Sequence, residues 1–222
     1  MRPGDNAAAM TPQAHRHLAR VDPVLRDLMR HAQRCTLRPV RGESPYQALV
    51  NAIAHQQLTG KAARTILGRL QALHPHGGLP TPEELTALPQ STLRGIGFSS
   101  AKALALHDIA QKTLDGVIPT RRTLARLGDE AIVERLVQVR GVGRWTVEMF
   151  LIFTLARPDV LPVDDYGVQN GFRLAYGLDA LPRPRELAEF GRRWAPYRTT
   201  AAWYLWRAVD LHRGAADRDG GA

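Results

Sequence analysis

Apolar residues recur along this chain at the three- and four-residue intervals that place them on one face of an α-helix. The stretch from His15 to Gln33 has this pattern, with apolar positions at Leu18, Val21, Leu25 and Leu28. No run of alternating β-branched residues is bounded by tight turns, as strands would require. The pattern therefore predicts an all-α protein with roughly ten helices joined by short loops.

Polar residues and glycine mark where several of these helices begin and end. Ser44 precedes a proline, which is well tolerated in the first helical turn. Thr59 is a candidate N-cap, and Thr81 followed three residues later by Glu84 matches a capping box. Gly116 predicts a helix end, because glycine readily adopts the left-handed conformation found there.

Composition narrows the class of protein. The chain has 222 residues, of which 44% are hydrophobic, and its net charge is +9. This charge favours a nucleic acid as partner. Cys35 is the single cysteine, which excludes a disulfide framework, a cysteine zinc site and a four-cysteine iron–sulfur cluster within this chain. Membrane spans and a secretory signal are not indicated, so we expect a cytoplasmic protein with no membrane partner.

Two closely spaced glycines give the most informative local pattern. One amphipathic helix is predicted to end near Val137, Gly141 and Gly143 follow, and a second helix begins near Arg144. The glycines permit a tight turn and the close approach of another chain. N–H groups at the start of the second helix form an anion site suited to a DNA phosphate. We expect four apolar residues to pack this hairpin as a fixed unit: Leu136, Val139, Val142 and Val147.

Three stretches in order resemble the 3-methyladenine DNA glycosylase II (AlkA) group of the helix-hairpin-helix DNA glycosylases. They are AIAHQQLTGKAA, then GVGRWTVEMFLIF with LPVDDYGVQNGF, and finally WAPYRTTAAWYLW. The resemblance extends from Asp22 to His212. It implies a monofunctional enzyme of base excision repair that flips alkylated bases, of the 3-methyladenine and 7-methylguanine type, out of duplex DNA. The N-glycosidic bond is then hydrolysed with the help of an aspartate.

The resemblance also implies a two-domain organisation. Residues 44–156 would form a helical domain that contains the hairpin. Residues 12–43 and 157–212 would form a second helical domain that carries the catalytic aspartate at an interdomain cleft. Residues 1–11 and 213–222 are expected to be disordered tails. The protein would act as a monomer on double-stranded DNA with alkylated bases, in the bacterial cytoplasm at the nucleoid.

Catalysis is assigned by the resemblance to the second member of an aspartate pair. Asp165 follows Trp145 at the interval that the group shows, and Asp164 would then be structural, capping the next helix or orienting the loop. Spacing alone leaves the reverse assignment open. Trp145 stands where bifunctional relatives carry a Schiff-base lysine, which implies that lyase activity is absent. The chemistry is consistent, because one carboxylate can stabilise a sugar cation and direct the attacking water.

Other roles follow from the same resemblance. The base pocket would consist of Trp145, Met149 and Trp206, and Met149 replaces an aromatic residue, which leaves the substrate range open. Leu58 would be the wedge that fills the base stack. DNA contacts are expected at Gln57, Leu58, Gly141, Gly143, Arg144 and Thr146. No cofactor would be required, although the carbonyls of Val137, Val139 and Gly141 could hold a structural Na⁺ or K⁺.

Two alternatives stay open at this point. A glycosylase for oxidised or deaminated bases would release 8-oxoguanine or uracil rather than methylated purines. A non-catalytic helix-hairpin-helix DNA-binding module would keep the glycine hairpin but would have no need of Asp165, Trp145 or the Gln57–Leu58 pair.

Overall fold

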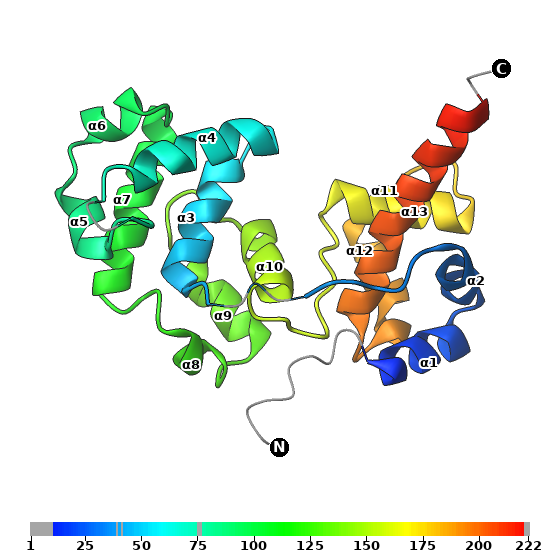
Figure 1. Cartoon of the computed structure of the whole chain (residues 1–222). Coiled ribbons are helices and arrows are strands. Elements are labelled where there is room, and N and C mark those ends of the chain that lie inside the picture. The colour runs from blue at the N-terminus through cyan, green and yellow to red at the C-terminus, as the bar shows by residue number, and fades with distance from the viewer. Residues whose placement is uncertain (1–10, 39, 41, 75–76, 220–222) are drawn as a thin grey trace. The chain divides into compact units, whose positions relative to one another are not determined.

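The structure, a computed structural model, describes residues 11–38, 40, 42–74 and 77–219, with side chains described through residue 213. This part of the chain is helical and contains no strand, which confirms the predicted fold class. Its α-helices, labelled in Figure 1, are α1 (Pro12–Val21), α2 (Pro23–His31), α3 (Pro45–His55), α4 (Gly60–Gln71), α5 (Pro82–Ala87), α6 (Gln90–Gly95), α7 (Ser100–Leu114), α8 (Arg121–Leu124), α9 (Asp129–Leu136), α10 (Arg144–Phe153), α11 (Tyr166–Tyr176), α12 (Pro184–Gly191) and α13 (Arg198–Asp219). The short 3-10 helix η2 (Arg192–Trp194) lies between α12 and α13 in sequence. None of these described helices has the length and apolar character that crossing a bilayer requires.

The chain divides into two compact units, which we call unit 1 (residues 1–39 and 151–222) and unit 2 (residues 40–150). The divisions lie a few residues from the expected positions at 44 and 156. The second boundary falls between residues 150 and 151 and not after 156, because the end of α10 packs in unit 1, where Phe153 stacks on Trp206. The expected N-terminal tail lies, apart from Thr11, outside the described residues, as do residues 220–222. Residues 213–219 continue α13 instead of forming a tail, since that segment contains no proline to end the helix.

The local signals for helix ends are confirmed. The side chains of Ser44, Thr59 and Thr81 each accept a hydrogen bond from a backbone N–H in the first turn of the following helix. Gly116, just beyond α7, has a φ of +73°. These interactions span only three or four residues, which is why the sequence predicts them well.

The N-terminal apolar stretch forms two helices and not one continuous segment. Asp22 interrupts it, with its side chain accepting hydrogen bonds from the N–H groups of Val24 and Leu25 at the start of α2. Pro23 cannot donate to a preceding turn, so α1 ends there. The other carboxylate oxygen of Asp22 accepts bonds from the Tyr176 hydroxyl and from Trp194 Nε1. This buried aspartate therefore links α2 to α11 and η2.

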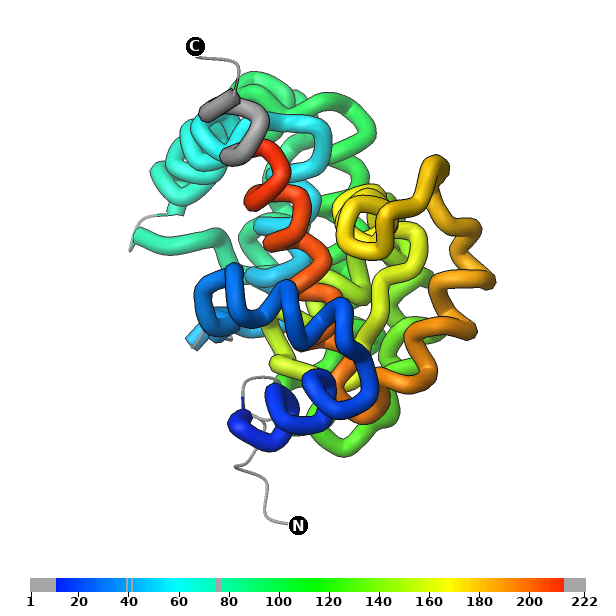
Figure 2. The backbone as a smooth tube through the Cα atoms, turned by 90° about the vertical axis from the view of Figure 1, so that its right-hand side faces the viewer, coloured from blue at the N-terminus to red at the C-terminus, as the bar shows by residue number. Residues whose placement is uncertain are grey.

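Unit 1 is built on the close packing of α11 against α13, which lie side by side in Figures 1 and 2. Gly171 makes this approach possible. A Cβ at this position would lie 1.9 Å from the backbone carbonyl oxygen of Leu205 in α13. The contact fixes how α13 lies along α11, and it brings the residue after Leu205 to the beginning of α11.

Unit 2 surrounds α7, which packs against α3, α5 and α6. Its core includes Leu49 and Ile53 of α3 and Leu106 and Ile109 of α7, all of which are fully buried. The hairpin formed by α9, α10 and the loop between them belongs to this unit, up to Phe150. Both the hairpin and the loop between α3 and α4 are thus attached to one common core.

Candidate active site

Asp165 is the N-cap residue of α11. Its Oδ1 accepts a hydrogen bond from the backbone N–H of Val168 at 2.8 Å, and a second from Nε1 of Trp206, also at 2.8 Å. The preceding loop is held as well, because the Gln169 side-chain amide donates to the carbonyl of Val163 at 2.7 Å. The half-buried carboxylate therefore has a fixed orientation at the positive end of a helix dipole.

The expected role of Asp164 as the helix cap is wrong. Since α11 begins at Tyr166, the cap position falls on Asp165, whose extended backbone directs its carboxylate towards the first-turn amides. Asp164 is exposed in the turn just before it. Its other suggested role, orienting the loop, stays a prediction. One aspartate thus combines the capping geometry and the candidate catalytic position.

Trp206 meets Asp165 through a close fit between α11 and α13. Its ring stacks on Phe153, with centroids 5.8 Å apart and planes at 20°. A Cβ at Gly167 would lie 2.9 Å from Trp206 Cδ1 and 3.0 Å from Asp165 Oδ1. Position 167 therefore needs glycine for the indole N–H to reach the carboxylate.

The glycine hairpin packs as the sequence predicts. Its apolar residues Leu136, Val139, Val142 and Val147 are all buried. Gly141 has a φ of +76° and packs against two helices. A Cβ there would lie 3.3 Å from Ile53 Cδ1 of α3 and 3.4 Å from Ala105 Cβ of α7. The loop is also anchored by the backbone N–H of Arg140, which donates to Asp108 Oδ2 at 2.7 Å. The hairpin is therefore a rigid element of unit 2.

The predicted DNA-contact residues of the hairpin differ in exposure. Gly143 is exposed, and a Cβ built on it would meet nothing within 4 Å. The protein's own packing therefore does not require glycine there. Arg144 is half exposed and pairs with Glu130, an interaction that lowers the pKa of that carboxyl. Thr146 is only 6% exposed, so its side chain contributes little to the surface of the hairpin, and its contact with DNA stays a prediction.

Two of the predicted pocket residues lie on α10 in unit 2. Trp145 is 45% exposed, which is unusual for a tryptophan without a surface role. Met149 is half-buried and follows one helical turn later, so both lie on the same side of the helix. The third, Trp206, belongs to unit 1 with Asp165. The structure thus brings the predicted pocket residues into two groups, each on its own unit.

Gln57 and Leu58 lie in the loop between α3 and α4. Both are exposed, and Leu58 retains 39% of its accessible surface. Gln57 has a φ of +56°, in the left-handed region that residues other than glycine seldom adopt. The exposure of Leu58 is compatible with the wedge role that the resemblance implies, which stays a prediction.

The three carbonyls suggested for a monovalent cation lie around the hairpin loop. Carbonyl oxygens are suitable ligands for Na⁺ or K⁺, and each has two lone pairs. Val139 O accepts one hydrogen bond, from the Val142 N–H at 3.0 Å. Gly141 O also accepts one, from Gln56 Nε2 at 3.0 Å. Val137 is the C-cap of α9. Carbonyl oxygens are a donor set suited to a monovalent cation, and the ion itself stays a prediction.

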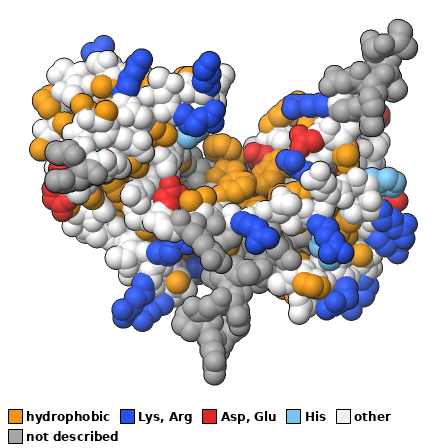
Figure 3. Space-filling view, in the orientation of Figure 1, with side chains coloured by type: hydrophobic (Ala, Val, Ile, Leu, Met, Phe, Trp, Pro, Cys, Tyr) orange, Lys and Arg blue, Asp and Glu red, His pale blue; other side chains and the backbone are white. Residues whose placement is uncertain are grey.

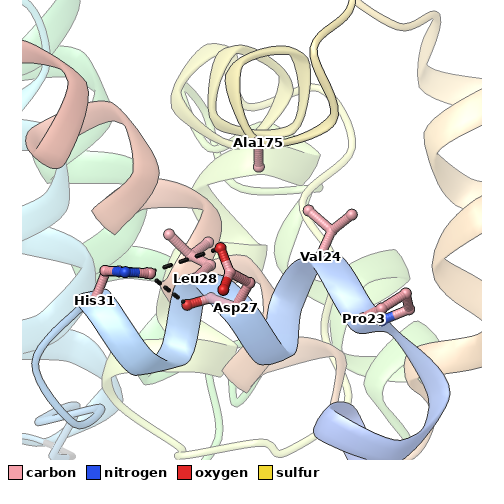
Figure 4. Close-up of a pocket in the computed structure, with 6 residues that line it drawn as sticks. All are labelled: Pro23, Val24, Asp27, Leu28, His31 and Ala175. Atoms are coloured by element: carbon pink, nitrogen blue, oxygen red, sulfur yellow. Dashed lines mark hydrogen bonds and ion pairs between the residues drawn. The ribbon is translucent and has the colours of Figure 1, made fainter.

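The wider surface adds two observations. Figure 3 shows Lys and Arg side chains spread over the face that it draws, in keeping with the net charge of +9. Figure 4 shows a pocket of unit 1 between α2 and α11, where His31 hydrogen-bonds to the backbone carbonyl of Asp27. Its lining includes no predicted site residue, so we assign it no part in the chemistry.

Sequence reasoning missed several contributors to these sites. It treated Trp206 as a stacking surface and did not predict its hydrogen bond to Asp165. It also did not single out Gly167 and Gly171, although two glycines four residues apart on one helix are a recognisable signal for close helix packing. Phe153 carries no local signal, because its contact is with the distant residue Trp206.

Comparison with known proteins agrees with this arrangement. The family description "HhH-GPD superfamily base excision DNA repair protein" matches residues 50–196. DNA-3-methyladenine glycosylase 1 of Schizosaccharomyces pombe is 42% identical over 174 residues, which cover 78% of this chain and 76% of the relative. Two solved structures are similar in fold. The S. pombe 3-methyladenine DNA glycosylase in complex with abasic DNA has a TM-score of 0.77 and 40% identity, covering 88% of this chain and 95% of that one. A DNA-3-methyladenine glycosidase from Bacillus halodurans has a TM-score of 0.80 and 33% identity, with 90% coverage of each chain. The two-glycine hairpin, the aspartate at the start of α11 and these matches place the chain in the HhH-GPD superfamily of base excision DNA repair proteins.

Proposed function

We propose that this protein is a monofunctional DNA glycosylase that excises alkylated bases of the 3-methyladenine and 7-methylguanine type from duplex DNA. The observation that carries the proposal is the geometry of Asp165. Its Oδ1 is held by the N–H groups of Val168 and Trp206. The names of the similar proteins, given above, support the same reaction and the same class of lesion.

In this proposal Asp165 acts on the sugar. The bond between C1′ and the base nitrogen breaks, both electrons leave with the base, and positive charge develops on the sugar. A carboxylate with a fixed orientation stabilises that charge and directs water to C1′, while the proton of the water passes to the carboxylate or to solvent. An alkylated purine already carries positive charge, so it leaves without a strong general acid. One aspartate is then sufficient, and a pair of carboxylates at glycosidase spacing is unnecessary.

The substrate base must leave the duplex before the reaction. Extrusion costs a few kcal/mol, and less for a damaged pair. Leu58 would fill the vacated place in the stack, with Gln57 beside it at the minor groove. The exposed ring of Trp145, Met149 and the ring of Trp206 would receive the base, because electron-poor cationic bases stack favourably on indole. Trp145 cannot form a Schiff base, so the product is an abasic site without strand cleavage.

The hairpin would hold the DNA backbone through N–H groups at the start of α10, with Gly143 allowing the strand to approach closely. Arg144 would add a charge contact. We further propose that the protein acts as a monomer on double-stranded DNA, in the cytoplasm at the nucleoid.

A monovalent cation held by Val137, Val139 and Gly141 would add positive charge beside a bound phosphate. No step at Asp165 depends on this ion. If it is bound, exchanging K⁺ for tetramethylammonium at equal ionic strength should weaken binding to duplex DNA, as measured by fluorescence anisotropy. Equal affinity in the two salts would argue against the ion.

The central experiment measures base release from methylated duplex DNA. Wild-type protein should release 3-methyladenine and 7-methylguanine. Asp165→Asn should slow single-turnover release on the order of 100-fold, because the developing sugar cation loses its carboxylate. Asp164→Asn is the matched control and should stay close to wild type.

The outcomes separate the proposal from its rivals. Unchanged release by Asp165→Asn would remove that residue from catalysis, and a loss confined to Asp164→Asn would reverse the assignment. Release of uracil or 8-oxoguanine without methylated purines would indicate a glycosylase for other lesions. Binding without release from any lesion would indicate a non-catalytic DNA-binding module.

A further inference from the structure

The loop between α3 and α4 presents its exposed residues from a backbone conformation that needs support. Gln57 has a φ of +56°, in a region that a side chain with a Cβ disfavours. Such a conformation persists where surrounding contacts determine it. The residue just before it, Gln56, makes two contacts that meet this requirement.

The first contact comes from Lys102 in the first turn of α7. Its Nζ donates to the carbonyl oxygen of Ala54 at 2.9 Å and to that of Gln56 at 2.6 Å. A positive charge in the first turn of a helix is unfavourable to that helix's own dipole, whereas at a helix C-terminus it is favourable. The ammonium group of Lys102 therefore stabilises the C-terminus of α3 and the loop that follows it, although its charge is unfavourable at the N-terminus of α7. Burial lowers the pKa of its ammonium group, consistent with a partly enclosed position.

The second contact links the same loop to the glycine hairpin. Nε2 of Gln56 donates to the carbonyl oxygen of Gly141 at 3.0 Å. Gln56 is thus held through its backbone by α7 and through its side chain by the hairpin loop. All three elements belong to the compact unit 2, so these hydrogen bonds tie the Gln57–Leu58 turn to the hairpin within one unit.

We propose that Lys102 is a positioning residue for base extrusion: its ammonium group, bound to the carbonyls of Ala54 and Gln56, holds Gln57 and Leu58 in the conformation that enters the duplex. This inference rests on the proposed function and assigns a role to a residue that does not touch the reacting atoms. Without the ammonium group, the turn can relax away from its strained conformation. Leu58 would then enter the stack less often, while Asp165 and its partners in unit 1 would be unchanged.

The test compares one lesion in two duplexes. In the first, 7-methylguanine is paired with cytosine; in the second, it lies opposite an abasic-site analogue, so that its pair is already missing and extrusion is easier. Lys102→Met should slow single-turnover release from the paired duplex by about tenfold. Release from the unpaired duplex should fall by about twofold or less, because extrusion contributes less to that rate.

Four companion variants, one of them a double variant, test whether the ammonium group is the cause. Lys102→Arg keeps a cationic donor and should recover most of the paired-duplex rate. Lys112→Met makes the same change on the same helix, where the ammonium group lies 3.7 Å from Asp108 Oδ1 and not at the α3–α4 loop. Because Asp108 also accepts a hydrogen bond from the Arg140 N–H of the hairpin, the control is judged by selectivity: Lys112→Met should show no loss specific to the paired duplex. Leu58→Ala should reproduce the selective loss, and the double variant with Lys102→Met should be little slower than Leu58→Ala alone.

A fluorescent base reports extrusion directly. The fluorescence of 2-aminopurine beside the lesion should rise less on binding of Lys102→Met than of wild type.

The outcomes distinguish this inference from the proposed function. If wild type releases no methylated base from either duplex, the proposed function fails and the inference with it. If wild type is active and Lys102→Met matches it on both duplexes, only the role of Lys102 is overturned. An equal loss on both duplexes would also overturn it, because that result indicates general damage to the fold. Should Lys102→Met fail to fold, Lys102→Gln takes its place and is judged by the same comparison.

Discussion

At the scale of single residues, Trp206 contributes to the candidate site in two ways, because its indole N–H binds Asp165 and its ring is an aromatic surface. Hydrogen bonds to a charged group are stronger than bonds between neutral partners, and this one fixes which oxygen of Asp165 faces the indole. The ring itself is held by stacking on Phe153. In the proposed function the same residue would therefore orient the candidate catalytic carboxylate and offer an aromatic surface to the base.

Trp206→Phe separates these two roles. Phenylalanine keeps an aromatic face but cannot donate to Asp165, and a lost bond to a charged group costs about 1.5–3 kcal/mol. Single-turnover base release should fall between about tenfold and 100-fold, while affinity for methylated duplex DNA should change little. A variant that loses affinity but keeps its rate would show that only the stacking surface matters.

At the scale of elements, α11 and α13 are positioned by two glycines on one helix. Gly171 allows the α13 backbone at Leu205 to touch α11. Gly167 leaves space for the indole of Trp206, the residue that follows Leu205 in α13. The start of α11 then carries a carboxylate whose partner comes from the middle of another helix. The geometry of Asp165 therefore depends on how tightly these two helices pack.

Gly171→Ala should accordingly destabilise the protein and impair the site together. The added methyl would lie 1.9 Å from the Leu205 carbonyl oxygen, so the helices must separate, at a cost of about 3 kcal/mol or more. Gly68→Ala is the matched control. It lies within α4 with nothing near its Cβ, and it should stabilise by about 0.5–1 kcal/mol. Chemical denaturation measures both, and equal effects would refute the packing argument.

At the scale of the whole molecule, charge and fold serve different purposes. A net charge of +9 attracts DNA over a distance but carries no sequence information. In the proposed function, selectivity for a lesion belongs to the pocket residues and to Asp165. A carboxylate at the proposed reaction centre is compatible with a strongly basic protein, because arginines would contact phosphates while the aspartate would stabilise a sugar cation.

Binding should therefore depend strongly on salt. Each phosphate contact adds about 0.9 to the slope of log K against log salt concentration. Arg144→Ala should lower that slope by about 0.9 and weaken binding equally for all duplex sequences. The half-exposed pair with Glu130 is weak enough to be exchanged for a phosphate. Anisotropy titrations across a KCl series measure the slope, and an effect that varied with sequence would contradict a phosphate contact.

Local patterns accounted for much of the fold. The all-α class, the helix starts at Ser44, Thr59 and Thr81, and the packed hairpin were all predicted from residues within one or two helical turns. The break at Asp22 was missed, because the apolar spacing continues across it. The motif order also led to the family, since three stretches in sequence are far more specific than one glycine hairpin.

The sequence by itself determined most of the helices, the caps at Ser44, Thr59 and Thr81, the hairpin and the position of the aspartate pair, because each depends on interactions among near neighbours. The structure showed which aspartate caps α11, and only the tertiary packing decided that Trp206, 41 residues further on, donates to it. It likewise decided that Lys102 reaches back 46 residues to the carbonyl of Gln56. Such contacts depend on how helices pack, and packing is set by the whole core and not by any local pattern.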